Sequence, residues 1–272
     1  MAGLPNPIDE GKRVLETARQ REISLRLLGG VAIGIRCTSA LTYLRRKYAD
    51  LDFIGLGSES REVKNLLVDL GYLPQKRFNA LHGRNRLLFD DEEQQRHVDI
   101  FLDVFDMCHT FNLKGRLTIE PDTLTLADLL ATKLQIAQIN IKDYIDLTAL
   151  LLDHDIGDQD SYDKINGTYL SKICSDDWGV YKDFRTNLDN VLHFLDNVKT
   201  DRELSDLQIE TVSLRVNKLL QMIESTPKSV KWKMRAKIGE KMPWNKLPEE
   251  VVRATNPLHA GSLARFPHGP YG

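Results

Sequence analysis

Two aspartates separated by one residue are the strongest chemical signal in this sequence. Asp50-Leu51-Asp52-Phe53 has the pattern of a strand, and residues two apart in a strand point to the same face. The two carboxylates therefore share a face, while Leu51 and Phe53 turn toward the core. Like charges this close favour a cation between them, and Mg²⁺ is a hard cation that prefers oxygen ligands. Alternatively, Asp50 is a turn residue and only Asp52 is aligned.

A third carboxylate lies in a later strand-like segment. Val98-Asp99-Ile100-Phe101 places Asp99 among apolar residues, and Asp103 has the same parity and is its rival. Burying an unpaired carboxylate is costly, and a bound metal ion is one remedy. Three aspartates on adjacent strands suit two-metal phosphoryl or nucleotidyl transfer, in which ions about 3.5–4 Å apart hold the attacking and leaving oxygens.

The pair Gly29-Gly30 lies between a short apolar segment and a helical one. Glycines at this junction allow a tight turn and the close approach of an anion. The helix that follows offers free N–H groups and a partial positive charge. The pattern is that of a phosphate cradle, although a plain turn also explains two glycines.

Over about residues 23–104 these motifs resemble the signature of the polymerase-β-type nucleotidyltransferase superfamily. Gly30 stands where many members have serine, and this variant is familiar in the branch of abortive-infection (AbiEii-like) nucleotidyltransferase toxins. The resemblance implies that Asp50, Asp52 and Asp99 are catalytic and hold two Mg²⁺ ions, or Mn²⁺ in their place. It also implies that Gly29 and Gly30 cradle the β- and γ-phosphates of an NTP such as ATP.

A second pattern supports the toxin branch. Leu129-Leu130-Ala131-Thr132-Lys133, followed by Lys142-Asp143-Tyr144-Ile145-Asp146-Leu147, resembles its Lys…Lys-Asp-x-x-Asp-Leu motif. The resemblance implies that Lys133 binds the nucleotide phosphates and that Asp143 is catalytic. Alternatively, Lys133 extends to the surface from an apolar helix stripe. Asp143 could equally belong to a solvated acidic face or favour the helix dipole.

The toxin branch often has an arginine shortly before its Asp-x-Asp strand. Arg45-Arg46-Lys47 could supply this arginine, but its spacing to Asp50 matches the pattern of the branch only approximately. Arg36, on the helix after Gly30, is the other candidate for nucleotide binding. An exposed helix cation explains Arg36 equally well.

Near the C-terminus, lysines and arginine interleave with tryptophan over residues 228–246. Such a segment can bind a nucleic-acid backbone and stack on its bases. It can also be a solvated surface with the tryptophans packed into the fold, or a face for a triphosphate or an acidic partner protein. Trp178, outside this segment, fits a packing role between helices.

The hydrophobic periodicity predicts a first half of α+β or α/β type, followed by an α-helical bundle domain. The family resemblance implies an α+β fold in which a nucleotidyltransferase-type mixed sheet is flanked by helices. The expected divisions are an N-terminal helix (1–22), a nucleotidyltransferase core (23–115), a helical domain (116–255) and a flexible tail (256–272). No strand is expected beyond Thr123. Strands are expected at 23–28, 51–55, 75–81, 84–89 and 97–104, and helices at 7–21, 31–47, 59–70, 125–140, 141–153, 161–174, 177–198 and 204–225.

Composition excludes other classes of protein. The 272 residues include 37 basic and 39 acidic side chains, a net charge of −2, so no global field attracts the whole chain to nucleic acid or to a membrane. Three widely spaced cysteines argue against a disulfide framework and a structural zinc site. With no signal peptide and no apolar run of membrane-spanning length, the expected location is the cytoplasm, with no membrane partner.

The sequence thus predicts an Mg²⁺-dependent nucleotidyltransferase that moves an NMP from an NTP to an acceptor hydroxyl. RNA, especially a tRNA end, is the favoured acceptor, with a protein or a small molecule such as an antibiotic left open. The toxin resemblance adds an antitoxin as a partner. Two alternatives remain, namely a catalytically inactive nucleotide-binding protein of the same fold and an RNA-binding protein whose acidic cluster is structural.

Overall fold

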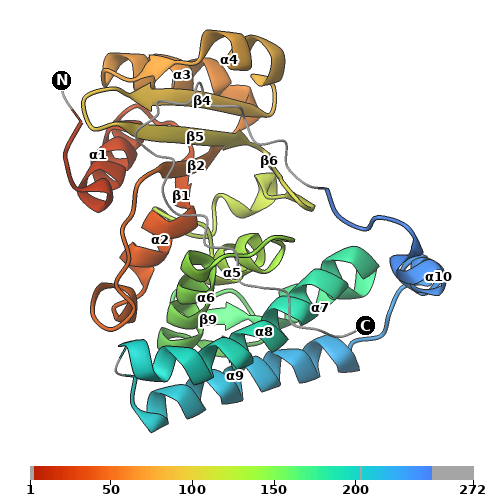
Figure 1. The fold of residues 1–272 in the computed structure, drawn as a ribbon. Coiled ribbons are helices and arrows are strands. Elements are labelled where there is room, and N and C mark those ends of the chain that lie inside the picture. The colour runs from red at the N-terminus through yellow and green to blue at the C-terminus, as the bar shows by residue number, and fades with distance from the viewer. Residues whose placement is uncertain (1–2, 203, 247–272) are drawn as a thin grey trace.

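The computed structural model describes residues 3–202 and 204–246. Its N-terminal part is a mixed sheet with helices packed around it, so the predicted α+β class is confirmed (Figure 1). The elements in chain order are α1 (Pro7–Gln20), β1 (Leu25–Leu28), α2 (Gly29–Arg36), β2 (Leu51–Gly55), α3 (Ser60–Asp69), β3 (Leu73–Pro74), α4 (Lys76–His82), β4 (Arg86–Asp91), β5 (Arg96–Leu102), β6 (Val104–Asp106) and β7 (Thr110–Asn112).

The strand order explains how distant residues meet. Within the described residues the strands run β1-β2-β5-β4-β3, with β6 and β7 continuing from β5. β2 and β5 are parallel, and the remaining pairs in this sheet are antiparallel. In this register Asp52 lies opposite Leu28 on one side and Asp99 on the other. One row across the sheet therefore joins the end of β1, and the Gly29-Gly30 turn that follows it, to two of the predicted carboxylates.

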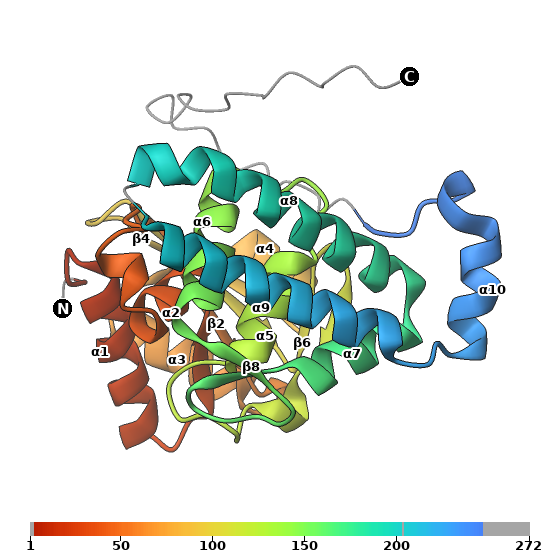
Figure 2. The same ribbon diagram turned by 90° about the horizontal axis from the view of Figure 1, so that it is seen from below.

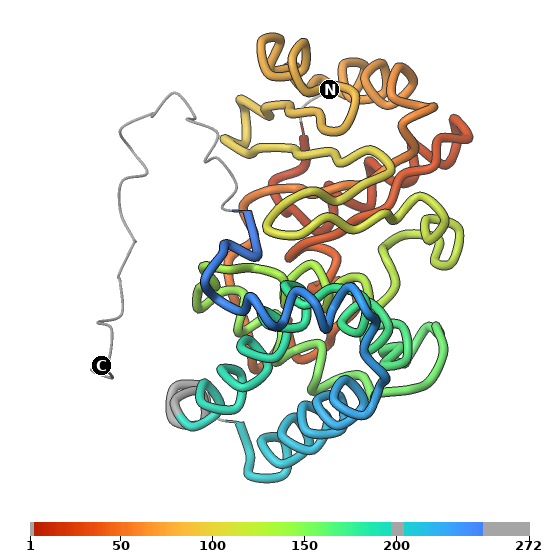
Figure 3. The backbone as a smooth tube through the Cα atoms, turned by 90° about the vertical axis from the view of Figure 1, so that its right-hand side faces the viewer, coloured from red at the N-terminus to blue at the C-terminus, as the bar shows by residue number. Residues whose placement is uncertain are grey.

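The C-terminal part is mainly helical and lies beneath the sheet in Figure 1. Figure 2 shows α8 and α9 side by side, and Figure 3 shows α10 on the face turned toward the viewer. Its elements are α5 (Leu126–Leu134), α6 (Ile141–Asp153), β8 (Asp155–Gly157), β9 (Lys164–Asn166), α7 (Gly167–Asp176), α8 (Trp178–Arg202), α9 (Asp206–Ser225) and α10 (Val230–Ile238).

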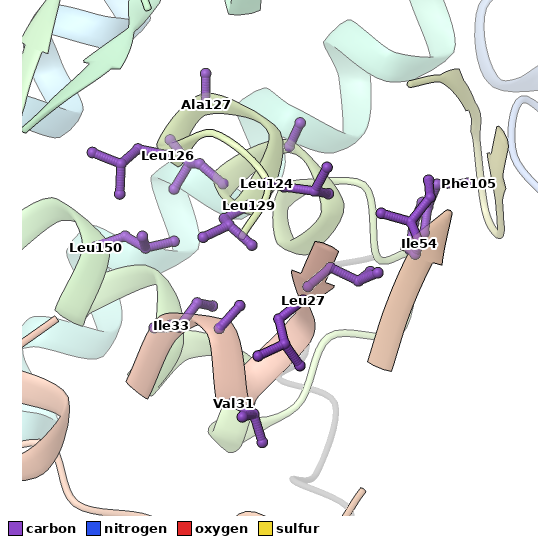
Figure 4. Packing of buried hydrophobic residues seen from close by; sticks show 14 of the residues in the cluster. Leu27, Val31, Ile33, Ile54, Phe105, Leu124, Leu126, Ala127, Leu129 and Leu150 are labelled. Carbon is purple, nitrogen blue, oxygen red and sulfur yellow. The ribbon is translucent and has the colours of Figure 1, made fainter. Parts of the chain in front are cut away.

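A continuous apolar core joins the two parts. Leu27 of β1 and Ile33 of α2 are fully buried, as are Leu129 of α5 and Leu150 of α6 (Figure 4). The boundary between 23–115 and 116–255 stays a prediction, because one core runs across it. The tail predicted at 256–272 lies outside the described residues, as does the end of the helical domain from residue 247.

Three of the predicted elements are wrong. Residues 75–81 lie mostly in helix α4 instead of a strand. The side chain of Asn79 accepts from the N–H of Leu88 and donates to its C=O, and these two hydrogen bonds occupy part of the edge of β4. The helix predicted at 31–47 ends at Arg36, because Cys37 is extended and the N–H of Ser39 is held by Asp153.

The third error lies beyond Thr123, where β8 and β9 form a short parallel pair. This pair replaces the start of the helix predicted at 161–174. Ile156 and Ile165 are buried opposite each other in the pair, and the side chain of Asn166 then caps α7. By contrast, the predicted bounds of the strand at 51–55 and of the helix at 141–153 are confirmed.

The described helices were also compared with the requirements of a membrane span. Within residues 3–202 and 204–246, none combines the length and the apolar character that crossing a bilayer requires.

Candidate active site

The side chain of Asp52 lies against the backbone of Gly29. Gly29 has φ +66°, and a Cβ atom there would lie 2.2 Å from Oδ2 of Asp52. Glycine is therefore required at this position for two reasons, its left-handed backbone conformation and the close carboxylate. The predicted association of the Gly-Gly turn with the Asp-x-Asp strand is thus present as a direct contact.

Asp50 and Asp99 flank Asp52. Asp50 precedes β2, and its Oδ1 accepts a hydrogen bond from the N–H of His97 at 3.3 Å. Asp99 lies directly opposite Asp52 on β5. The rival of Asp99, Asp103, turns away with φ +60° and accepts from the N–H of Gly57 at 3.0 Å.

The negative charge at Asp52 is poorly compensated. Among the residues that the structure describes, no hydrogen-bond donor reaches its carboxylate. Burial, together with the charges of Asp99 and Asp50, raises the pKa of Asp52 to about 7, although Lys133 and Arg86 act in the opposite direction. A carboxylate in this situation fits a bound cation.

Asp99, unlike Asp52, is not free to bind a cation. The guanidinium of Arg86, on β4, donates from Nε to both of its oxygens, at 2.9 and 3.1 Å, and from Nη2 to Oδ2. In the described part of the chain, moreover, no three His, Cys, Asp or Glu side chains form a group that could hold a metal ion. Asp50 and Asp52 therefore fit a divalent cation, whereas the predicted set of three aspartates does not fit while Arg86 holds Asp99.

Lys133 of α5 connects this cluster to α6. Its Nζ lies 2.8 Å from Oδ1 of Asp143 and 2.9 Å from Oδ2 of Asp146. Burial acts to lower the pKa of Lys133, but Asp146 and Asp143 outweigh it and raise that pKa above its usual range. Lys133 is thus a paired, largely buried cation and does not extend to the surface. Asp143 also closes the capping box at the start of α6 with Asn140.

Arg46 is the site residue that the sequence located only approximately. It donates from Nε to Oδ1 and from Nη2 to Oδ2 of Asp146, both at 2.7 Å. A Cβ atom on Gly30 would lie 1.7 Å from its Nη2, so the guanidinium rests on the Gly-Gly turn. The second glycine therefore makes room for a cation, as the first makes room for a carboxylate.

The start of α2 adds free hydrogen-bond donors beside Arg46. Leu28, the residue before the helix, is extended and has no side-chain acceptor with which to cap the first N–H groups. These groups and the guanidinium together offer an anion a site of positive potential.

Arg36 does not lie near the Gly29-Gly30 turn. It lies at the other end of α2, where its largely buried guanidinium donates to Thr123 Oγ1 at 3.0 Å, lies 3.6 Å from Glu120 and stacks on Tyr162. It is therefore neither an exposed helix cation nor a neighbour of the Gly-Gly turn.

In the basic C-terminal segment, 228–246, the aromatic rings pack inward. Trp232 packs edge-on against Tyr181, and Trp244 donates to Asp183 at 2.7 Å and packs against Trp178. The predicted packing role of Trp178 is consistent with its burial. Lys231, Lys233, Lys237 and Lys241 are exposed. The segment thus presents charge to solvent, but its tryptophans are engaged within the fold.

Comparisons with known proteins give distant similarities. No family model matches the chain, and no curated protein matches it by sequence. Two solved structures are similar to 51% of it at 14% identity. One is the lincosamide antibiotic adenylyltransferase LnuA with lincomycin bound, covered over 92% with a TM-score of 0.37. The other is the antibiotic-resistance factor ANT(2'')-Ia, covered over 79% with a TM-score of 0.35. At this distance, the function of the chain is inferred from its own side chains.

Proposed function

We propose that this protein is a divalent-metal-dependent nucleotidyltransferase that moves an NMP from an NTP to an acceptor hydroxyl. The observation that carries the proposal is the contact of Asp52 with Gly29, which places an uncompensated carboxylate beside the uncapped start of α2. A carboxylate next to an anion-binding turn requires a cation between them, which is the arrangement that a metal–nucleotide complex satisfies.

The side chains divide the task of binding the nucleotide. The first N–H groups of α2 and the Arg46 guanidinium bind the β- and γ-phosphates, and Lys133 neutralises charge on the triphosphate. Asp143 and Asp146 hold Lys133 in position. Asp50 and Asp52 would hold the metal ion, which acts as a Lewis acid toward phosphate oxygens when it is bound.

The reaction would be attack of the acceptor oxygen on the α-phosphorus. A new P–O bond forms, the bond to pyrophosphate breaks, and the hydroxyl proton is released. These side chains contribute by holding the reactants in line and compensating charge, which are the main sources of catalysis in phosphoryl transfer.

For the acceptor we propose RNA, with a tRNA end favoured. What supports this is the exposed lysine face of residues 228–246, where Lys233, Lys237 and Lys241 have no acidic partner within the described ranges. Phosphate contacts of this kind do not need the tryptophans. The proposal that the protein is the toxin of a toxin–antitoxin pair is supported by the motif resemblance alone.

The test uses radiolabelled NTPs with Mg²⁺ or Mn²⁺ and a panel of acceptors, namely total tRNA, protein and small-molecule antibiotics. Asp52→Asn should lower transfer at least about 100-fold, since it removes a predicted metal ligand. Asp69→Asn, an exposed aspartate on α3 paired with Arg21, is the matched control and should leave the rate unchanged. Growth arrest on expression that Asp52→Asn relieves would support the toxin role.

Transfer by Asp52→Asn at the wild-type rate would contradict the proposal. The alternative, an inactive nucleotide-binding protein of this fold, predicts that Mg-NTP binds in calorimetry but releases no pyrophosphate with any acceptor. The capture of Asp99 by Arg86 is the observation that favours this alternative.

A further inference from the structure

Arg86 occupies a niche built around Asp99. Besides its two-pronged contact with that carboxylate, its guanidinium carbon lies 4.9 Å from the ring centre of Phe101 and 5.9 Å from that of Phe78. Its Nη1 lies 3.7 Å from the sulfur of Met107. Four neighbours, two on β5, one on α4 and one in the turn after β6, thus fix one orientation of the side chain, which is largely withdrawn from solvent.

This niche changes the charge available to cations. Three aspartates lie near one another at the start of the β2–β5 pairing, but Arg86 pairs with one of them, and within the described residues neither Asp50 nor Asp52 has an ion-pair partner. Two-pronged guanidinium–carboxylate pairs are the stronger kind of hydrogen-bonded ion pair. Both oxygens of Asp99 already accept from Arg86, so a metal ion that bound Asp99 would either lie close to this cation or displace it, and displacement would leave a partly buried guanidinium without its partner.

We propose that Arg86 is an internal counter-ion that keeps Asp99 from binding a metal ion. The free protein then binds one divalent ion, at Asp50 and Asp52, instead of two. This inference rests on the proposed function, because it takes Asp50 and Asp52 as the metal ligands. It departs from the three-aspartate, two-ion site that the sequence predicts.

The experiment is a titration of the full-length protein with Mn²⁺ in the absence of nucleotide, with free Mn²⁺ followed by electron paramagnetic resonance. The wild-type protein should bind one equivalent. Arg86→Gln should bind two, because Asp99 becomes available, and Arg86→Gln combined with Asp99→Asn should return to one. Arg21→Gln, which removes an exposed arginine paired with Asp69, is the control and should bind one.

A second comparison keeps the inference testable if Arg86→Gln does not fold. In the wild-type background, folded Asp99→Asn should still bind one equivalent of Mn²⁺, because Asp99 is not a ligand, although the unpaired Arg86 beside Asp52 should weaken that binding. Asp52→Asn should abolish binding. Circular dichroism establishes that each variant is folded.

The outcomes separate the two claims. Two equivalents bound by the wild-type protein, one equivalent bound by folded Arg86→Gln, or no Mn²⁺ bound by folded Asp99→Asn would each overturn the role of Arg86 and leave the proposed function standing. Failure of the wild-type protein to bind Mn²⁺ would overturn the metal site, and the inference with it.

Discussion

Asp52 holds the least compensated charge that the site contains. Because its folded-state pKa, about 7, lies above the usual value of 3.8, the folded protein retains a proton that the unfolded chain releases between those pH values. The stability that this proton contributes is fully present below about pH 4 and is lost as the pH rises through about 7.

The raised pKa predicts that the difference in unfolding free energy between Asp52→Asn and the wild-type protein depends on pH. In EDTA, Asp52→Asn should gain stability relative to the wild-type protein as the pH rises from 5 to 8, by on the order of 2 kcal/mol. Urea denaturation at each pH measures this difference in stability, and Mg²⁺ added at pH 8 should make the difference smaller. Two stability curves that stay parallel over this range would show that Asp52 titrates normally.

At the scale of single residues, the sequence located the acids better than the cations. Asp52 and the glycines were predictable because their spacing encodes one strand and one turn, while Asp50 lies just before that strand. Arg86 was not, because its contact with Asp99 depends on the antiparallel register of β4 and β5. A cross-strand partner of this kind leaves no periodic signal in the chain.

At the scale of elements, the turn from β1 into α2 determines the geometry of the site. Gly29→Ala should cost about 1–2 kcal/mol, since alanine is disfavoured at φ +66°. It should also lower Mg-NTP affinity at least about tenfold, because the new methyl group displaces the Asp52 carboxylate. Urea denaturation and calorimetry measure the two effects.

Gly115→Ala is the matched control for this substitution. Nothing lies within 4 Å of a Cβ atom at Gly115, so this variant should retain both stability and affinity. If Gly29→Ala bound nucleotide as the control does, the contact between Asp52 and the turn would have no part in binding.

Element prediction succeeded where one local pattern dominated. Ile141–Asp153 carries its own capping box and an apolar stripe, so its bounds were readable. The segment after α2 was not, because Cys37 leaves the helical conformation and the N–H of Ser39 is held by Asp153 of α6, a residue far away in the sequence. That irregular segment carries Arg46 to the site, which is why the sequence placed the arginine only approximately.

At the scale of the whole molecule, Asp146 ties the two parts of the chain together. It receives Arg46 from the segment before β2 and Lys133 from α5. Asp146→Asn should therefore raise the KM for NTP about tenfold, with a smaller effect on kcat, because both cations lose their shared anchor. It should also cost about 3–5 kcal/mol of stability, as expected when one partner of a buried ion pair is removed.

Steady-state kinetics and urea denaturation measure these effects. Asp155→Asn, which alters an exposed carboxylate near Arg215 and Lys218, is the control and should change neither. Unchanged KM in folded Asp146→Asn would mean that Arg46 and Lys133 do not contact the nucleotide.

The backbone of residues 122–124 also crosses between the two parts. The N–H of Leu27 donates to Asp122 and the N–H of Leu124 donates to Leu27, both at 2.9 Å, along the side of β1 that faces away from β2. An open strand edge is a template for pairing with other chains, and proteins avoid aggregation by covering it. The first residues of the helical part thus cover the edge of the sheet at β1. The sheet would lose that protection if it were separated from the helices.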